Sequence, residues 1–108
     1  MKTVQRELRR HQRILVPEGC TIRCEGSEPK VDGAVTVIGP GGMFIRTLNS
    51  QPVGAVLKLV LKQGTTTFNV ECAVRHVAEN GIGVEFVGLS PGDEKNISDL
   101  LHQLRPHG

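Results

Sequence analysis

The segment 67-TFNVECAVRHV-77 alternates apolar and polar side chains with a period of two residues. One face would carry Phe68, Val70, Cys72, Val74 and His76, and the other Asn69, Glu71, Ala73 and Arg75. Successive side chains of a β-strand point to opposite faces, so this pattern predicts a strand with one face buried in a core. His76, near the end of the segment, is expected on that apolar face.

Similar patterns recur along the chain and are separated by turn segments rich in Gly, Pro and Asn. They predict strands over residues 14–24, 34–38, 43–47, 55–62, 67–77 and 81–87. Six short strands joined by close turns favour an all-β fold. The expected architecture is a small six-stranded antiparallel β-barrel, because closing a sheet into a barrel leaves no exposed strand edge.

The last part of the chain has a helical pattern. Ser90 is the predicted N-cap, Pro91 the first helical residue, and Asp93 completes a capping pattern. Apolar side chains then recur at helical spacing, at Ile97, Leu100, Leu101 and Leu104. This predicts a C-terminal α-helix that packs its apolar stripe over the barrel. A helix that binds a partner is the alternative.

Charge divides the chain into two parts. Of 13 Lys and Arg and 11 Asp and Glu, residues 1–13 hold five basic groups and one acidic group, a net charge of +4. Residues 14–108 then hold eight basic and ten acidic groups, a net charge of −2. We therefore expect one domain, with a flexible basic N-terminal arm over 1–13 and the barrel and helix over 14–108. A basic arm suggests an anionic partner, and a solvated tail is the alternative.

Composition favours a soluble globular protein, with 38% hydrophobic and 22% charged residues. No apolar run approaches the roughly 20 residues of a membrane helix, so membrane insertion is not expected. The N-terminal segment lacks the apolar core of a secretory signal, and a cytoplasmic location is the default expectation.

The sequence contains no pattern that predicts catalysis or metal binding. No Ser/His/Asp or Cys/His arrangement and no carboxylate pair stands out, so we expect neither an enzyme nor a cofactor. Cys20, Cys24 and Cys72 are interpreted as small core residues. Their number is odd, and residues four apart on a strand lie about 13 Å apart, too far to share a metal ion.

Three features resemble the PilZ domain family in their order and spacing. Arg9 and Arg13 form an Arg-x-x-x-Arg pair before the first predicted strand. The Gly-rich segment 35-VTVIGPGGMFIRT-47 follows, and 81-GIGVEFVGLSPGDEKNISDLL-101 is a strand that runs into a capped helix. The resemblance extends from about Arg9 to Leu104. It implies a six-stranded antiparallel barrel with a C-terminal helix, in agreement with the pattern of strands.

The resemblance also implies a bacterial signal-transduction domain that binds cyclic di-GMP. Arg9 and Arg13 would contact the phosphates and guanines of this nucleotide from the flexible arm, with Arg10 as a second arginine beside Arg9. A guanidinium group suits this role, because it is always charged and forks onto phosphate oxygens or onto guanine O6 and N7. A rival register, Arg6 with Arg10, leaves three residues before the apolar run and fits less well.

The second family motif, Asp/Asn-x-Ser-x-x-Gly, is incomplete. With its last residue on Gly42, Val37 and Gly39 occupy the Asp/Asn and Ser positions. Each lost polar partner costs about 1–3 kcal/mol, so two losses would weaken binding by about 10²–10⁴-fold. Backbone N–H groups of 39-GPGG-42 would compensate if they formed an anion-binding nest. The structural alternative is that the glycines supply positive φ in a tight turn that Pro40 presets.

The expected ligand-binding residues are therefore Arg9, Arg10, Arg13, Gly39 and Gly42. The first functional hypothesis is a PilZ-like cyclic di-GMP receptor that signals to a downstream protein partner when its arm becomes ordered. The second is a PilZ-like protein-interaction adaptor that has lost the ligand, as Val37 and Gly39 suggest. A nucleic-acid-binding barrel is disfavoured, because single-strand binders use aromatic platforms and the chain has three Phe but no Tyr or Trp.

Overall fold

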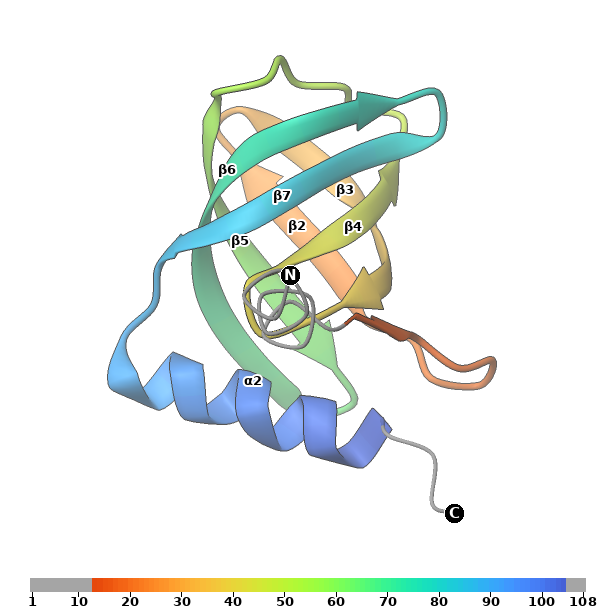
Figure 1. Ribbon diagram of the computed structural model, residues 1–108, viewed down its shortest axis with the longest axis vertical. Helices are drawn as coiled ribbons and strands as arrows, with labels where there is room; N and C mark the ends of the chain where they lie inside the picture. The colour runs from red at the N-terminus through yellow and green to blue at the C-terminus, as the bar shows by residue number, and fades with distance from the viewer. Residues whose placement is uncertain (1–12, 105–108) are drawn as a thin grey trace, which may run out of the picture.

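Antiparallel pairing closes the strands into a barrel in the computed structural model, which describes residues 13–104 (Figure 1). The strands are β1 Ile14–Leu15, β2 Arg23–Ser27, β3 Lys30–Ile38, β4 Gly42–Thr47, β5 Val56–Gln63, β6 Thr66–Ala78 and β7 Gly81–Gly88. Their order is β1-β3-β2-β5-β6-β7-β4, and pairing of β3 with β4 closes the ring. Six strands form the barrel, β1 is an addition to it, and the predicted all-β barrel is confirmed.

The predicted first strand over 14–24 is wrong in one respect, because it is interrupted. Leu15 pairs with Val37 and Arg23 pairs with Ala34, so β1 and β2 follow the same edge of β3 with a loop between them. Pro17 starts that loop, its carbonyl accepts a bond from the Cys20 N–H at 3.1 Å, and Gly19 has a φ of 91°. A proline without an N–H and a glycine at positive φ do not continue a ladder.

Strand β3 begins four residues earlier than the predicted start at residue 34. The sequence patterns left residues 25–33 outside the predicted strands, whereas β2 continues to Ser27 and pairs it with Lys30. Val31 is fully buried within the added part of β3. Asp32 and Gly33 lack the apolar, β-branched character of strand residues, and this masked the pattern.

The barrel interior is filled by the apolar faces that period-two alternation predicted. On β5, Leu57, Leu59 and Leu61 are buried, while Lys58 and Lys62 are exposed. On β6, Phe68, Val70 and Cys72 point inward, and Ile82 and Val84 of β7 do the same. Phe86 is only partly buried and packs against the edge of this core.

The helix α2, Pro91–Leu104, crosses one end of the barrel (Figure 1). Its buried side chains are the predicted stripe Ile97, Leu100, Leu101 and Leu104, which join the barrel core. The predicted N-cap is confirmed. The Ser90 Oγ accepts from the Asp93 N–H at 3.1 Å and donates to the Asp93 carboxylate at 2.7 Å. The other Asp93 oxygen accepts from the Asn69 N–H of β6, which ties the helix start to the barrel.

The three cysteines are free thiols. Cys24 and Cys72 are fully buried, as expected of core residues, and burial raises the pKa of each to about 12. Cys20 is half-buried in the loop after β1. Over residues 13–104, no three His, Cys, Asp or Glu side chains gather as metal ligands would, and no helix has the length and apolar character to cross a bilayer.

Replacing the capping hydroxyl tests how firmly α2 is attached. Ser90→Ala removes the acceptor of the Asp93 N–H and should lower the free energy of unfolding by about 1 kcal/mol, the usual value of a lost N-cap. Urea denaturation measures it. Ser98→Ala, an exposed change within the same helix, is the matched control and should stay within about 0.5 kcal/mol of the parent. Equal effects of the two changes would contradict a capping role for Ser90.

Candidate functional site

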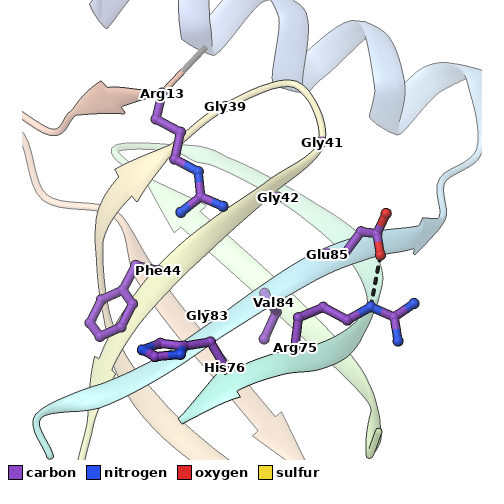
Figure 2. A pocket seen from close by; sticks show the side chains of 10 residues that line it. All are labelled: Arg13, Gly39, Gly41, Gly42, Phe44, Arg75, His76, Gly83, Val84 and Glu85. Carbon is purple, nitrogen blue, oxygen red and sulfur yellow. Dashed lines mark hydrogen bonds and ion pairs between the residues drawn. The ribbon is translucent and has the colours of Figure 1, made fainter. Parts of the chain in front are cut away.

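A hollow of about 330 Å³ lies on the outer surface of the barrel, where β4, β7 and β6 run side by side. Figure 2 shows the ten residues that line it. The turn between β3 and β4 borders it on one side, and Arg13 reaches it from the residue before β1. We call this hollow the barrel-side cavity. Residues far apart in the sequence meet there only because the barrel closes.

Two rows of outward-facing residues cross the three strands. Strand pairing aligns Gly42 of β4, Glu85 of β7 and Ala73 of β6 in one row. It aligns Phe44, Gly83 and His76 of the same strands in the next. Each row contains a glycine without a side chain. Gly83 leaves space between Phe44 and His76, and Gly42 leaves space beside Glu85.

The prediction that His76 lies on the apolar face is wrong. Val74 pairs with Val84, but His76 pairs with Gly83, so Arg75 is an extra residue and forms a β-bulge. One inserted residue moves every following side chain to the other face, because the side-chain period of a strand is two. Val74 therefore stays in the core, whereas Arg75 and His76 are both exposed at the cavity.

Two guanidinium groups and one carboxylate determine the charge of the cavity. The Arg13 side chain extends past Gly39 and Gly42 into it (Figure 2). Arg75 donates its Nε–H to the Glu85 Oε1 at 2.8 Å, and both side chains are about half exposed. A pair this open to water contributes only about 0–1 kcal/mol, so either partner exchanges readily to a ligand. The three groups sum to +1, which favours an anionic ligand.

The residues predicted from the family resemblance divide into two sets. Arg13, Gly39 and Gly42 line the barrel-side cavity together. Arg9 and Arg10 lie outside the described residues, and so does Arg6 of the rival register. Binding by any of them stays a prediction.

Val37, at the Asp/Asn position of the second motif, does not line the cavity. It pairs with Leu15 on one edge of β3 and with Phe44 on the other, and its side chain is half-buried. The motif position on β3 therefore brings no polar group to this cavity.

The turn 39–42 does not use its glycines as the structural interpretation expected. Within residues 13–104, positive φ occurs only at Gly19, Gly54 and Gly64, so the expected positive φ in this turn is wrong. Gly42 is required instead by close approach, since a Cβ there would collide with the Val84 carbonyl of β7. The Gly39 N–H already donates to the Gly42 carbonyl at 2.8 Å, which removes it from any anion-binding nest.

Seven of the ten described lining residues are not among the expected ligand-binding residues, namely Gly41, Phe44, Arg75, His76, Gly83, Val84 and Glu85. Alternation in 81–87 already placed Glu85 opposite the apolar face, and Phe44 stands between the buried Met43 and Ile45. The sequence does not give the strand order, and it is this order that places β4 and β6 on either side of β7 and brings their outward side chains together. The bulge at Arg75 could not be predicted from the sequence, because no Gly or Pro at or beside Arg75 marks an interruption of the strand.

Comparison with known proteins gives one family match and several structural neighbours. The family model of the PilZ domain matches residues 7–103. The chain is similar to the PilZ domain with c-di-GMP of YcgR from Escherichia coli, with a TM-score of 0.74 and 15% identity over 88% of this chain and 89% of that one. Comparison with curated protein sequences gives no match.

Longer structures share the same fold. MrkH, described as a c-di-GMP-dependence transcription regulatory factor, gives a TM-score of 0.73 at 19% identity, over 88% of this chain and 50% of MrkH. The inhibitor of motility MotI/DgrA from Bacillus subtilis gives 0.65 at 16% identity, over 87% of this chain and 50% of its own. The chain thus spans about half the length of these two neighbours. At such identities the likeness shows the fold alone.

The two glycines that line the cavity on β4 and β7 should respond differently to a methyl group. Gly42→Ala should lower the free energy of unfolding by about 1–3 kcal/mol, because its Cβ would overlap the Val84 carbonyl and the strands would have to separate. Gly83→Ala is the matched control. Its methyl group would lie 3.4 Å from the His76 Cβ and 3.9 Å from the Phe44 Cδ1, both ordinary contacts. Chemical denaturation of both variants measures the difference, and equal stability would contradict the close approach at Gly42.

Proposed function

The chain belongs to the PilZ domain family, and from this premise we propose that it is a regulatory domain that binds cyclic di-GMP at the barrel-side cavity. The observation that carries the proposal is the position of Arg13, whose side chain enters a cavity with glycines on its floor and a second arginine on its wall. The role is binding and signalling rather than catalysis. A cytoplasmic location is part of the proposal.

Arginine chemistry supports this ligand class. Guanidinium groups fork onto phosphate oxygens and onto the O6 and N7 atoms of guanine, and a cyclic dinucleotide offers two of each. In the proposal Arg9, Arg10 and Arg13 supply most of the affinity. Gly39 and Gly42 let the nucleotide approach the turn, where a larger side chain at either position would narrow the entrance.

Because the second motif is degenerate, other residues of the cavity have to supply the hydrogen bonds that its Asp/Asn and Ser side chains would make. Val37 and Gly39 offer no side-chain hydrogen bond to a guanine edge. Arg75 lines the same cavity, and the hydrogen bonds found among residues 13–104 engage only its Nε–H, which leaves its terminal N–H groups for a ligand. We assign to Arg75 part of the affinity that the missing Asp/Asn and Ser would have given.

A second candidate function is a protein-interaction adaptor without a nucleotide. It is favoured by Val37 and Gly39, and by a larger groove of about 580 Å³ between α2 and the β3–β4 turn. Pro40, Leu89 and Ile97 contribute apolar surface to that groove, and Glu94 and Lys95 contribute charge. In the receptor proposal the same groove would bind a downstream protein partner. The turn 39–42 borders both the groove and the barrel-side cavity, so a ligand in the cavity would contact the turn that the partner also contacts. A nucleic-acid partner is not part of either proposal.

Arginine substitutions test the receptor proposal. Arg9→Ala and Arg13→Ala should each weaken cyclic di-GMP binding by about 1.5–3 kcal/mol, the range for hydrogen bonds to charged groups, with little change in melting temperature. Arg46→Ala, on the exposed face of β4 and outside the cavity, should bind like the parent. Isothermal calorimetry gives the affinities. No heat from the parent at high micromolar nucleotide would overturn the proposal and favour the adaptor.

Restoring the second motif should strengthen binding. The double change Val37→Asp with Gly39→Ser supplies the absent polar side chains, one next to Phe44, with which residue 37 pairs, and one on the cavity lining. Affinity should rise by up to about 10²-fold. Gly39 does not need positive φ, so serine places no left-handed strain on the turn. Calorimetry and a thermal melt on the same sample separate affinity from stability. A folded double variant that binds no better than the parent would show that the ligand does not contact this part of β3.

A further inference from the structure

We propose that Glu85 is the specificity-determining residue of the barrel-side cavity and that it accepts hydrogen bonds from the Watson–Crick edge of a guanine base. The inference rests on the proposed function and goes beyond it, because it assigns base selection to β7 instead of to the second motif on β3. It follows from the donors and acceptors that the cavity offers, from the geometry around Glu85 and from the room above Gly83.

Among residues 13–104, Glu85 is the one carboxylate that lines the cavity. Arg13 and Arg75 donate only, His76 offers a ring nitrogen but no carboxylate, and the glycines, Phe44 and Val84 carry no polar side-chain atom. The guanine edge presents two adjacent donors, N1–H and the N2 amino group, which a carboxylate with two oxygens complements. Adenine presents an acceptor at N1 instead, and that lone pair would repel the carboxylate. Glu85 therefore favours guanine over adenine and over bases without the N2 amino group.

The surroundings of Glu85 leave its carboxylate accessible at one side of the cavity. Its neighbours in the cross-strand row are Gly42 and Ala73, which place no long side chain beside it. The Arg75 Nε–H engages one lone pair of Oε1 at 2.8 Å, while the hydrogen bonds found among residues 13–104 leave the other lone pair of Oε1 and the whole of Oε2 for a ligand (Figure 2). About half of each side chain is exposed, so a base can reach this oxygen without opening the barrel.

A flat base has a place to lie in the neighbouring row. Phe44 and His76 flank Gly83, and a methyl group on Gly83 would already contact both residues. A base above Gly83 would lie beside one or both rings and gain stacking contacts. Gly83 and Glu85 are two residues apart on β7, which is about 7 Å along a strand. A purine above Gly83 would thus direct an edge at the Glu85 carboxylate.

The test compares three ligands on the intact chain: cyclic di-GMP, cyclic di-AMP and cyclic di-IMP, in which hypoxanthine replaces guanine and the N2 amino group is lost. The parent should bind cyclic di-GMP about tenfold or more tightly than cyclic di-IMP, the value of one hydrogen bond to a charged acceptor, and cyclic di-AMP more weakly still. Glu85→Ala should bring the ratio of cyclic di-GMP to cyclic di-IMP affinity near one. The ratio of the two affinities is measured and not either affinity alone, because Glu85→Ala also frees Arg75 from its ion pair and so changes the affinity for every phosphate-containing ligand.

Two further variants control the experiment. Glu79→Ala removes an exposed carboxylate outside the cavity and should keep the parental ratio. Arg75→Ala should weaken all three ligands and keep the preference for guanine. A Glu85→Ala variant that retains the parental ratio, or a parent that binds all three equally, overturns the role of Glu85 and leaves the receptor proposal standing. A parent that binds none of the three overturns the proposed function itself.

Discussion

The close pairing of β4 with β7 is the contact on which the rest of the structure depends. It completes the ring in which β3, β2, β5, β6 and β7 follow one another, since β4 pairs with both β7 and β3. The two backbones approach so closely that a Cβ on Gly42 would meet the Val84 carbonyl, and one on Gly81 would meet the Ile45 carbonyl. Glycine at both ends of this pairing is therefore a condition for closure. Closure in turn buries the apolar face of every strand and leaves the opposite face for function.

The barrel-side cavity is a consequence of that closure together with one irregularity. Regular pairing of β6 with β7 would have sent His76 into the core, and the extra residue at Arg75 turns the His76 side chain outward, to the face that Arg75 already occupies. The core does not lose a residue, because Val74 still faces inward before the bulge. A local departure from the ladder thus adds the His76 ring to the surface beside Arg75, at little cost to packing.

The polar groups of this domain are distributed differently from the motif that its family suggests. The motif positions at the end of β3 and in the turn after it carry Val37 and Gly39, and Val37 pairs with Leu15 and Phe44 without lining the cavity. Charge in the cavity comes from Arg13, Arg75 and Glu85, from three separate parts of the chain. In the receptor proposal, the rigid barrel selects the base and the basic arm attracts the phosphates. Base selection then depends on the barrel, whose geometry strand pairing fixes, and phosphate attraction depends on the long-range charge of the arm.

The sequence by itself determined the barrel, the C-terminal helix with its Ser90 cap, and the buried faces of β5 and β7, because each follows from local periodicity or capping chemistry. It located Arg13, Gly39 and Gly42 through a linear motif. Local patterns did not reveal that residues 14–24 are interrupted at Pro17, or that β3 starts at Lys30. The tertiary structure alone decided which outward residues meet. Phe44, Arg75, His76, Gly83 and Glu85 come together because strand order sets β7 between β4 and β6, and because a bulge, invisible to period-two alternation, reverses the end of β6.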